Sequence, residues 1–139
     1  MRLVPDRTSN PFGFSPPCEA FVPGYGDANA DFHVIGDHPG VHGGRESGMP
    51  FTGRSWSERF FGALVDGGLV EGNPADPSSL DVRGTYFSYL HLCVSDVGDP
   101  DEASYAELEP FFDAELRAIT ADVLLPVGRR ATRHVLAEY

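Results

Sequence analysis

Four side chains suited to binding a metal ion or to moving protons lie close together in this sequence: Asp37, His38, His42 and Glu46. They follow a short apolar segment, residues 32–35, that is typical of a β-strand, and they belong to a loop with six glycines that extends to Gly53. In open α/β sheets, ligands bind beyond the carboxyl ends of the strands, and glycine lets backbone amides approach a ligand closely. We therefore predict a functional site in this loop.

The same four side chains allow a metal-binding interpretation, because carboxylate and imidazole groups together can hold a divalent ion. Their spacing matches no pattern with established ligand geometry. We keep metal binding as a minor alternative and expect no metal ion or other cofactor.

The elements around this loop alternate between strand and helix. The chain begins with an extended arm rich in proline and glycine (residues 1–30). The patterns then predict strands at 32–35, 85–93 and 122–127, and helices at 55–69, with Ser55 or Ser57 as its cap, at 103–119, interrupted near Pro110, and at 128–138. A surface loop is predicted at 71–83 and a second loop at 95–101. This order indicates an α/β three-layer sandwich, with a central parallel sheet and helices on both faces.

Length and hydropathy predict one domain. The chain has 139 residues, of which 41% are hydrophobic, enough for a single modest core, which we place at residues 31–139. The sequence contains neither an apolar run of about 18 residues nor a basic leader before an apolar stretch. We expect a cytoplasmic monomer without a membrane partner.

The charge balance bears on the partner. A formal charge of −11 ordinarily argues against nucleic-acid binding, which depends on cationic side chains. However, the chain has ten arginines, twenty-one acids and no lysine. This composition is typical of a halophilic proteome, in which salt screens charge over a few ångströms. The acidity then reflects habitat, and the alternative is an acidic domain that never meets DNA.

Two boxes in the loop resemble the uracil-DNA glycosylase superfamily, in particular its families 4 and 5. Residues 36–40 (GDHPG) and 48–53 (GMPFTG) resemble the two parts of the first active-site motif, and residues 42–44 (HGG) resemble the family 5 insert. Weaker likeness over most of residues 18–136 includes 22–31, 90–93, 109–112 and 124–129. The resemblance implies a glycosylase-like fold and a function in base excision from DNA.

The resemblance also implies roles for individual residues. Asp37 lies where family 4 has its active-site glutamate, so water positioning or charge stabilisation is expected, with His38 and His42 as further catalytic candidates. Phe51 takes the place of the residue that stacks on the extruded base, within reach of Asp37. Gly40 and Tyr89 complete the expected base-binding set, and Arg45 and Arg54 are expected to meet DNA phosphates.

Each of these residues also has a structural interpretation. Asp37 is equally suited to capping the turn before Pro39. His38 is alternatively an exposed loop residue, His42 a structural one, and Phe51 a core aromatic. Both arginines have acids nearby for surface ion pairs, namely Glu46 and Glu58, and Gly48 and Gly53 are simple turn formers.

The sequence departs from the family pattern in several places. Tyr89 stands where members usually carry an asparagine that reads uracil, and a phenol cannot pair with the uracil edge as an amide does. Arg54 replaces an acid that family 5 members tend to have. Cys18 and Cys93 are too few for the family 4 iron–sulfur cluster and establish no disulfide. We also find no strand and histidine loop after residue 138. We expect a fragment, with a degenerate DNA- or protein-binding module as the alternative.

Overall fold

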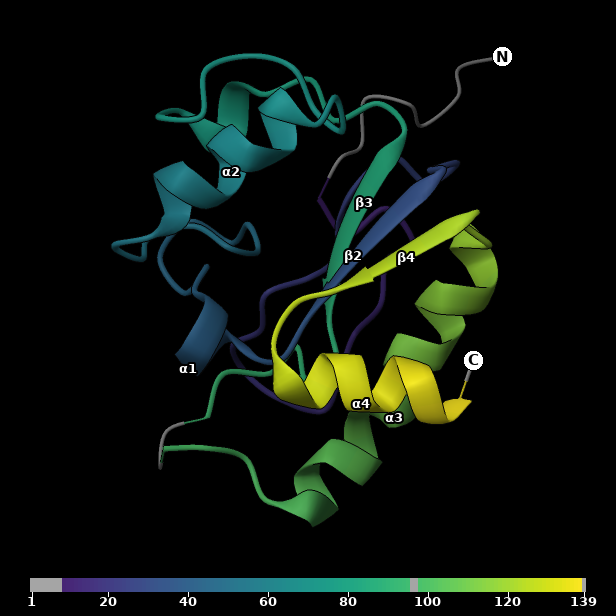
Figure 1. Ribbon diagram of the computed structural model, residues 1–139. Coiled ribbons are helices and arrows are strands. Elements are labelled where there is room, and N and C mark those ends of the chain that lie inside the picture. Colours follow the sequence, from purple (N-terminus) through teal and green to yellow (C-terminus); the bar gives the residue numbers. More distant parts are fainter. Residues whose placement is uncertain (1–8, 96–97, 139) are drawn as a thin grey trace.

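The computed structural model describes residues 9–95 and 98–138 (Figure 1). Parts of two predicted segments, the arm at residues 1–8 and the second loop at residues 96–97, lie outside the described residues. The elements, in chain order, are β1 (Tyr25–Gly26), β2 (Phe32–Gly36), α1 (Pro39–His42), α2 (Ser57–Asp66), the 3-10 helix η1 (Pro77–Ser79), β3 (Thr85–Tyr89), α3 (Glu102–Ile119), β4 (Val123–Pro126) and α4 (Arg129–Glu138).

The sheet has four strands in the order β1-β3-β2-β4. The three predicted strands are present and parallel: β2 is central and pairs with β3 on one side and β4 on the other. The parallel α/β architecture predicted from the alternating elements is therefore confirmed. The two-residue strand β1, which no pattern in the sequence indicated, pairs antiparallel with β3 and makes the sheet mixed.

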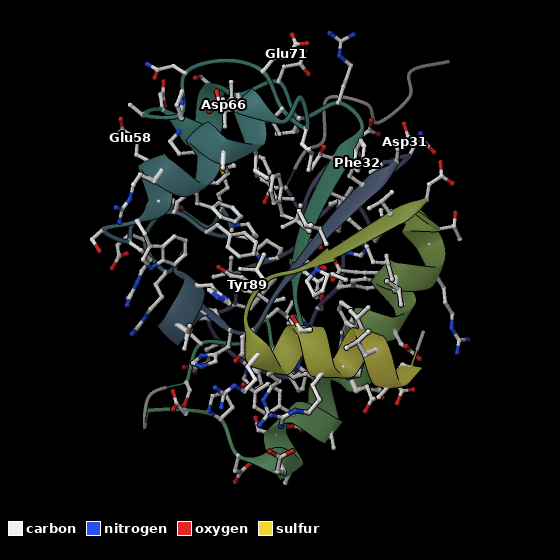
Figure 2. All side chains as sticks on the ribbon, in the orientation of Figure 1. Asp31, Phe32, Glu58, Asp66, Glu71 and Tyr89 are labelled. Atoms are coloured by element: carbon white, nitrogen blue, oxygen red, sulfur yellow. A yellow bond between two sulfur atoms is a disulfide. The ribbon has the colours of Figure 1, made fainter. Side chains whose placement is uncertain are left out.

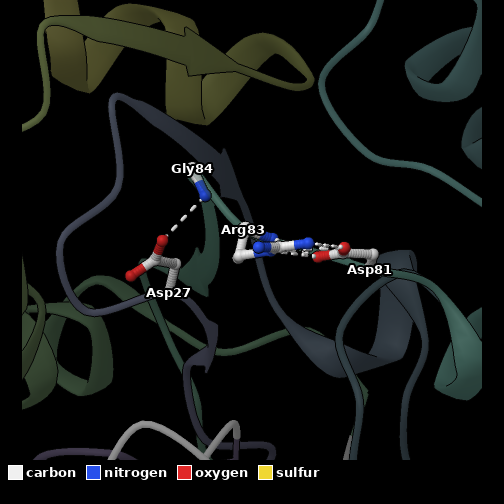
Figure 3. Close-up of polar contacts among 4 residues, drawn as sticks. All are labelled: Asp27, Asp81, Arg83 and Gly84. Atoms are coloured by element: carbon white, nitrogen blue, oxygen red, sulfur yellow. Dashed lines mark hydrogen bonds and ion pairs between the residues drawn. The ribbon is translucent and has the colours of Figure 1, made fainter.

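The turn after β1 is held by Asp27 (Figure 3). One carboxylate oxygen accepts a hydrogen bond from the amide of Gly84, just before β3, at 2.7 Å. The other oxygen accepts from the amide of Asn29 at 2.8 Å. Nearby, Arg83 pairs with Asp81 at the surface, at 2.8 Å. The bond between Asp27 and Gly84 ties the N-terminal arm to the amino end of β3, opposite the edge of the sheet where the predicted site lies.

Helices cover both faces of the sheet, as predicted (Figure 1). Successive side chains of β2 point to opposite faces, so Val34 packs with Phe61 and Leu64 of α2, whereas Ile35 packs with Phe112 of α3 and Ala131 of α4. Acidic side chains at the outer surface of α2 and the following loop, Glu58, Asp66 and Glu71, point away from the core (Figure 2). The sheet thus separates two apolar clusters, one under α2 and one under α3 and α4.

Helix boundaries differ modestly from the prediction. Trp56 is the N-cap of α2 and has no side-chain cap bond, so neither Ser55 nor Ser57 caps the helix. Instead, the Ser57 hydroxyl accepts a hydrogen bond from the amide of Arg54 at 2.9 Å. Gly67 is the C-cap of α2, so the helix ends before the predicted residue 69. Helix α3 continues through Pro110 without the predicted interruption.

The N-terminal arm is attached to the domain by a disulfide. Cys18 and Cys93 are bonded across 75 residues of sequence. Backbone hydrogen bonds reinforce this attachment, from Val22 to Leu92 and from Val94 to Ala20. The sequence left this pairing open, and the structure establishes it. Among residues 9–95 and 98–138, no helix is both long and apolar enough to cross a bilayer.

Candidate active site

The loop after β2 folds on itself through its histidines. His38 is the N-cap of the short helix α1, and its Nδ1 accepts a hydrogen bond from the Gly40 amide at 3.1 Å. The Gly43 amide donates to the Pro39 carbonyl at 2.8 Å. The amide of Gly40, a residue that we expected to bind the base, and the amide of Gly43 are therefore both engaged within the loop. A helix of four residues such as α1 is too short to produce a periodic pattern in the sequence.

Asp37 is positioned by two elements at once. Its backbone amide donates to Nδ1 of His42 at 2.9 Å, which fixes the turn out of β2. Its carboxylate oxygen Oδ1 accepts a hydrogen bond from the Tyr105 hydroxyl of α3. The carboxylate does not cap its own turn, so the turn-capping interpretation of Asp37 is wrong. The side chain is half-buried at the carboxyl edge of the sheet.

Tyr105 is held in turn from α4. The guanidinium carbon of Arg130 lies 3.8 Å from the centre of the Tyr105 ring, and Arg130 pairs with Glu102 of α3 at 2.6 Å. Burial, and then the hydrogen bond with Asp37, raise the pKa of Tyr105, so the phenol stays protonated and remains a donor. Sequence reasoning missed both residues, because an isolated tyrosine and arginine on two helices carry no motif.

His38 lies beside a second histidine at this edge. Only 3% of its surface is exposed, so the interpretation of His38 as an exposed loop residue is wrong. Its Nε2 lies 3.4 Å from the Asp99 carboxylate, and its ring centre lies 6.5 Å from that of His91. His91 contacts the Cys93 carbonyl through Nδ1 at 3.0 Å and the Ser104 hydroxyl through Nε2 at 2.7 Å.

The tautomers follow from these contacts. Because Nδ1 of His38 accepts from an amide, a neutral His38 carries its proton on Nε2, toward Asp99. His91 donates from Nδ1 to a carbonyl, so its Nε2 accepts from Ser104. Burial lowers the pKa of His91. His91 is therefore neutral near pH 7, while His38 offers an N–H donor.

His42 has the contacts of a structural residue. It is buried, its ring centre lies 5.3 Å from that of Phe51 and 5.9 Å from that of Trp56, and its Nδ1 is used by the Asp37 amide. Burial lowers the pKa of His42, which keeps the ring neutral and able to accept this bond.

Phe51 and Tyr89 fill the space where we expected a base. The Phe51 ring is fully buried and stacks on Phe60, with 4.7 Å between ring centres. The Tyr89 hydroxyl accepts from the Phe51 amide at 2.9 Å and donates to the Gly43 carbonyl at 2.8 Å. Tyr89 lies in the interior of the molecule (Figure 2), and burial raises its pKa.

The two halves of the expected site are therefore separated. The expectation that an open Phe51 ring lies within reach of Asp37 is wrong for this structure. The Phe51 ring is fully buried in the core under α2, whereas the Asp37 carboxylate faces α3. The interpretation of Phe51 as a core aromatic is confirmed.

Arg45 and Arg54 are exposed at the loop surface. The ion pairs considered for them, with Glu46 and Glu58, do not form within the described part of the chain. Nor do three or more His, Cys, Asp or Glu side chains of residues 9–95 and 98–138 converge in a way that holds a metal ion. The four side chains that suggested a metal site are used in other contacts or point to solvent.

Comparison with known proteins shows which family this chain resembles. The model of the uracil DNA glycosylase superfamily matches residues 23–138. A type-5 uracil-DNA glycosylase of Pyrobaculum aerophilum is 30% identical over 118 residues, covering 83% of this chain and 52% of the relative. The type-5 uracil-DNA glycosylase of Thermus thermophilus is 29% identical over 122 residues, covering 85% and 55%. The one of Mycobacterium leprae is 27% identical over 105 residues, covering 71% and 44%. The chain thus spans about half the length of these relatives.

Proposed function

Because the chain belongs to the uracil DNA glycosylase superfamily, we propose that it acts on DNA containing a damaged base and excises uracil or a related deaminated base by hydrolysing the N-glycosidic bond. The observation that carries this proposal is the Asp37 carboxylate, held at the carboxyl edge of β2 by Tyr105 and flanked by His38. The relatives, all named type-5 uracil-DNA glycosylases, support the same reaction.

In this proposal, the Asp37 carboxylate stabilises the positive charge that develops on the sugar during cleavage. Glycosidic cleavage passes through a sugar with oxocarbenium character, which a carboxylate stabilises directly or by orienting the attacking water. The departing base leaves as an anion and requires hydrogen-bond donors. We assign this role to the N–H at Nε2 of His38, which lies toward Asp99 in the structure, so the role of His38 is donation and not the removal of a proton from water.

The DNA backbone meets the loop surface. Arg45 and Arg54 are exposed, and neither forms an ion pair with another described residue, so both are available for phosphates. The remaining surface is strongly acidic, because the chain carries a formal charge of −11. Salt screens the repulsion this produces, so we propose that the protein functions at high ionic strength, in the cytoplasm of a halophile.

A second candidate function is a noncatalytic binding module of the same fold. The packing of Phe51 against Phe60 and the double hydrogen bonding of Tyr89 favour it, because together they close the base pocket expected from the family pattern. Under this alternative, the protein binds DNA or another protein and turns nothing over.

One experiment separates the two candidates. The full-length protein is incubated in molar KCl with labelled duplex and single-stranded oligonucleotides that contain uracil, hypoxanthine or xanthine, and abasic sites are revealed by alkali. Excision of one of these bases supports the glycosylase. DNA binding without abasic sites for any base supports the module. The absence of both DNA binding and excision contradicts the glycosylase and the DNA-binding form of the module, and leaves only a module that binds another protein.

A further inference from the structure

Three segments far apart in sequence meet at the Asp37 carboxylate. Asp37 follows β2, Tyr105 lies in the first turns of α3, and Arg130 lies at the start of α4. The hydroxyl of Tyr105 donates to Oδ1 of Asp37, and Arg130 lies over the face of the Tyr105 ring. Asp37 and Tyr105 are 68 residues apart in the sequence, and Glu102 and Arg130 are 28 residues apart. The fold alone brings these residues together.

The hydrogen bond leaves the two oxygens of Asp37 in different situations. Oδ1 is occupied by the phenol, whereas Oδ2 accepts no hydrogen bond from any described residue. A hydrogen bond to an ionised carboxylate is among the stronger bonds in proteins, and it fixes the rotation of the carboxylate plane. Among the described residues, Oδ2 is therefore the oxygen of Asp37 that no donor occupies.

The orientation of Tyr105 is itself fixed. Arg130 contacts the ring face, Glu102 neutralises Arg130, and the His91 ring lies 5.3 Å away in an edge-on arrangement. A cation over an aromatic ring is attracted by the negative face of the ring, so Arg130 favours one orientation of Tyr105. The phenylalanine variant keeps all of these ring contacts and loses only the hydroxyl.

We propose that Tyr105 is the positioning residue for Asp37: its hydroxyl holds Oδ1 so that Oδ2 faces the reacting water or sugar, while Arg130 fixes the Tyr105 ring. This inference rests on the function proposed above for its catalytic consequence. The arrangement of the carboxylate itself does not depend on that function.

The test uses single-turnover and steady-state excision by the wild type, Tyr105→Phe, Asp37→Asn and the double variant. Tyr105→Phe is expected to lower kcat about tenfold or more with KM little changed, because a charge-assisted hydrogen bond that orients Asp37 is lost. In the Asp37→Asn background, Tyr105→Phe is expected to have no further effect, since Tyr105 acts through Asp37. Tyr25→Phe, which removes a hydroxyl with no hydrogen bond among the described residues, is the matched control.

Two kinetic outcomes overturn the inference. The first is an active Tyr105→Phe variant with wild-type kcat. The second is an additional loss in the double variant equal to that in the single one, because a merely structural tyrosine acts independently of Asp37. An equal loss of kcat in Tyr25→Phe and Tyr105→Phe also overturns the inference, because the effect would then not be specific to the hydroxyl that contacts Asp37.

A wild-type protein without turnover contradicts the proposed function, and a separate measurement then decides the inference. With ¹³C-labelled tyrosine, the ring resonance of Tyr105 is titrated in the wild type and in Asp37→Asn. The carboxylate contributes to the raised pKa of Tyr105, so its loss is expected to bring that pKa down toward its ordinary value. An unchanged titration shows that the hydroxyl does not hold Asp37 and overturns the inference.

Discussion

Tyr86 of β3 donates a hydrogen bond of 2.5 Å to the carboxyl group of Glu115 of α3, and both side chains are buried between the sheet and the helix. Burial raises the pKa of Glu115 to about 8, and the hydrogen bond from Tyr86 offsets only part of that rise. Near pH 7 the buried carboxyl group is therefore mostly protonated. Neither residue belongs to the loop after β2, so we expect this pair to affect stability.

The first prediction concerns the pH dependence of stability. A carboxyl whose pKa is higher in the folded than in the unfolded chain stabilises the fold fully below the unfolded value, 4.5, and loses that contribution as the pH rises to about 8. His33, whose burial lowers its pKa to about 4, acts in the opposite sense, but only below pH 6.5. The window from 6.5 to 8 therefore isolates Glu115.

In that window the wild type is expected to lose about 2 kcal/mol of unfolding free energy through this group, and Glu115→Gln is expected to remove the loss. Chemical denaturation at a series of pH values measures both. Glu107→Gln, on the exposed side of the same helix, is the control and should keep the wild-type slope. Equal slopes in wild type and Glu115→Gln would show that Glu115 is not buried as described.

The second prediction concerns Gly36 at the end of β2. A Cβ at this position would lie 2.6 Å from Cζ of Phe51 and 2.8 Å from Cε1 of Tyr89, and neither ring has room to move. Gly36→Ala is expected to lower the unfolding free energy by about 1–3 kcal/mol through overpacking. Gly62→Ala in α2, whose Cβ would meet only Pro74 at 3.9 Å, is expected to raise it by about 0.5–1 kcal/mol. Thermal unfolding of both variants measures the difference, and a Gly36→Ala variant as stable as Gly62→Ala would refute the packing described.

The third prediction concerns the bond between Cys18 and Cys93. A cross-link across 75 residues restricts the unfolded chain, so replacing both cysteines by serine is expected to cost roughly 2–4 kcal/mol. Unfolding in denaturant with and without a reductant measures this. The wild type should lose stability on reduction, and the double variant should be indifferent to it. A wild-type midpoint that does not respond to full reduction would contradict this prediction.

Most of the fold could be predicted from the sequence, because the patterns that indicate its strands and helices are local. The apolar run ending at Ile35 and the helical spacing of Phe61 and Leu64 each depend on a few neighbouring residues, and the structure places them as predicted. Strand β1 could not be predicted, because a strand of two residues is too short to show an alternating pattern. The predicted interruption at Pro110 does not occur, because packing of α3 on the sheet outweighs the low helix propensity of proline.

The candidate site was predicted less completely, because its decisive contacts join distant segments. The loop itself was found from its glycines and its Asp and His residues. That Phe51 is closed off by Phe60, that Tyr89 is bonded to Gly43, and that Asp37 faces Tyr105 depend on tertiary packing, for which the sequence has no local signature.

The most direct test of the proposed function is the single-turnover rate of uracil excision from DNA at high salt by the wild type, Asp37→Asn and the surface control Asp66→Asn. We predict measurable excision by the wild type and by Asp66→Asn, and a loss of about 100-fold or more in Asp37→Asn, since the carboxylate stabilises the sugar cation or orients the attacking water. Equal rates in Asp37→Asn and the wild type would contradict the account.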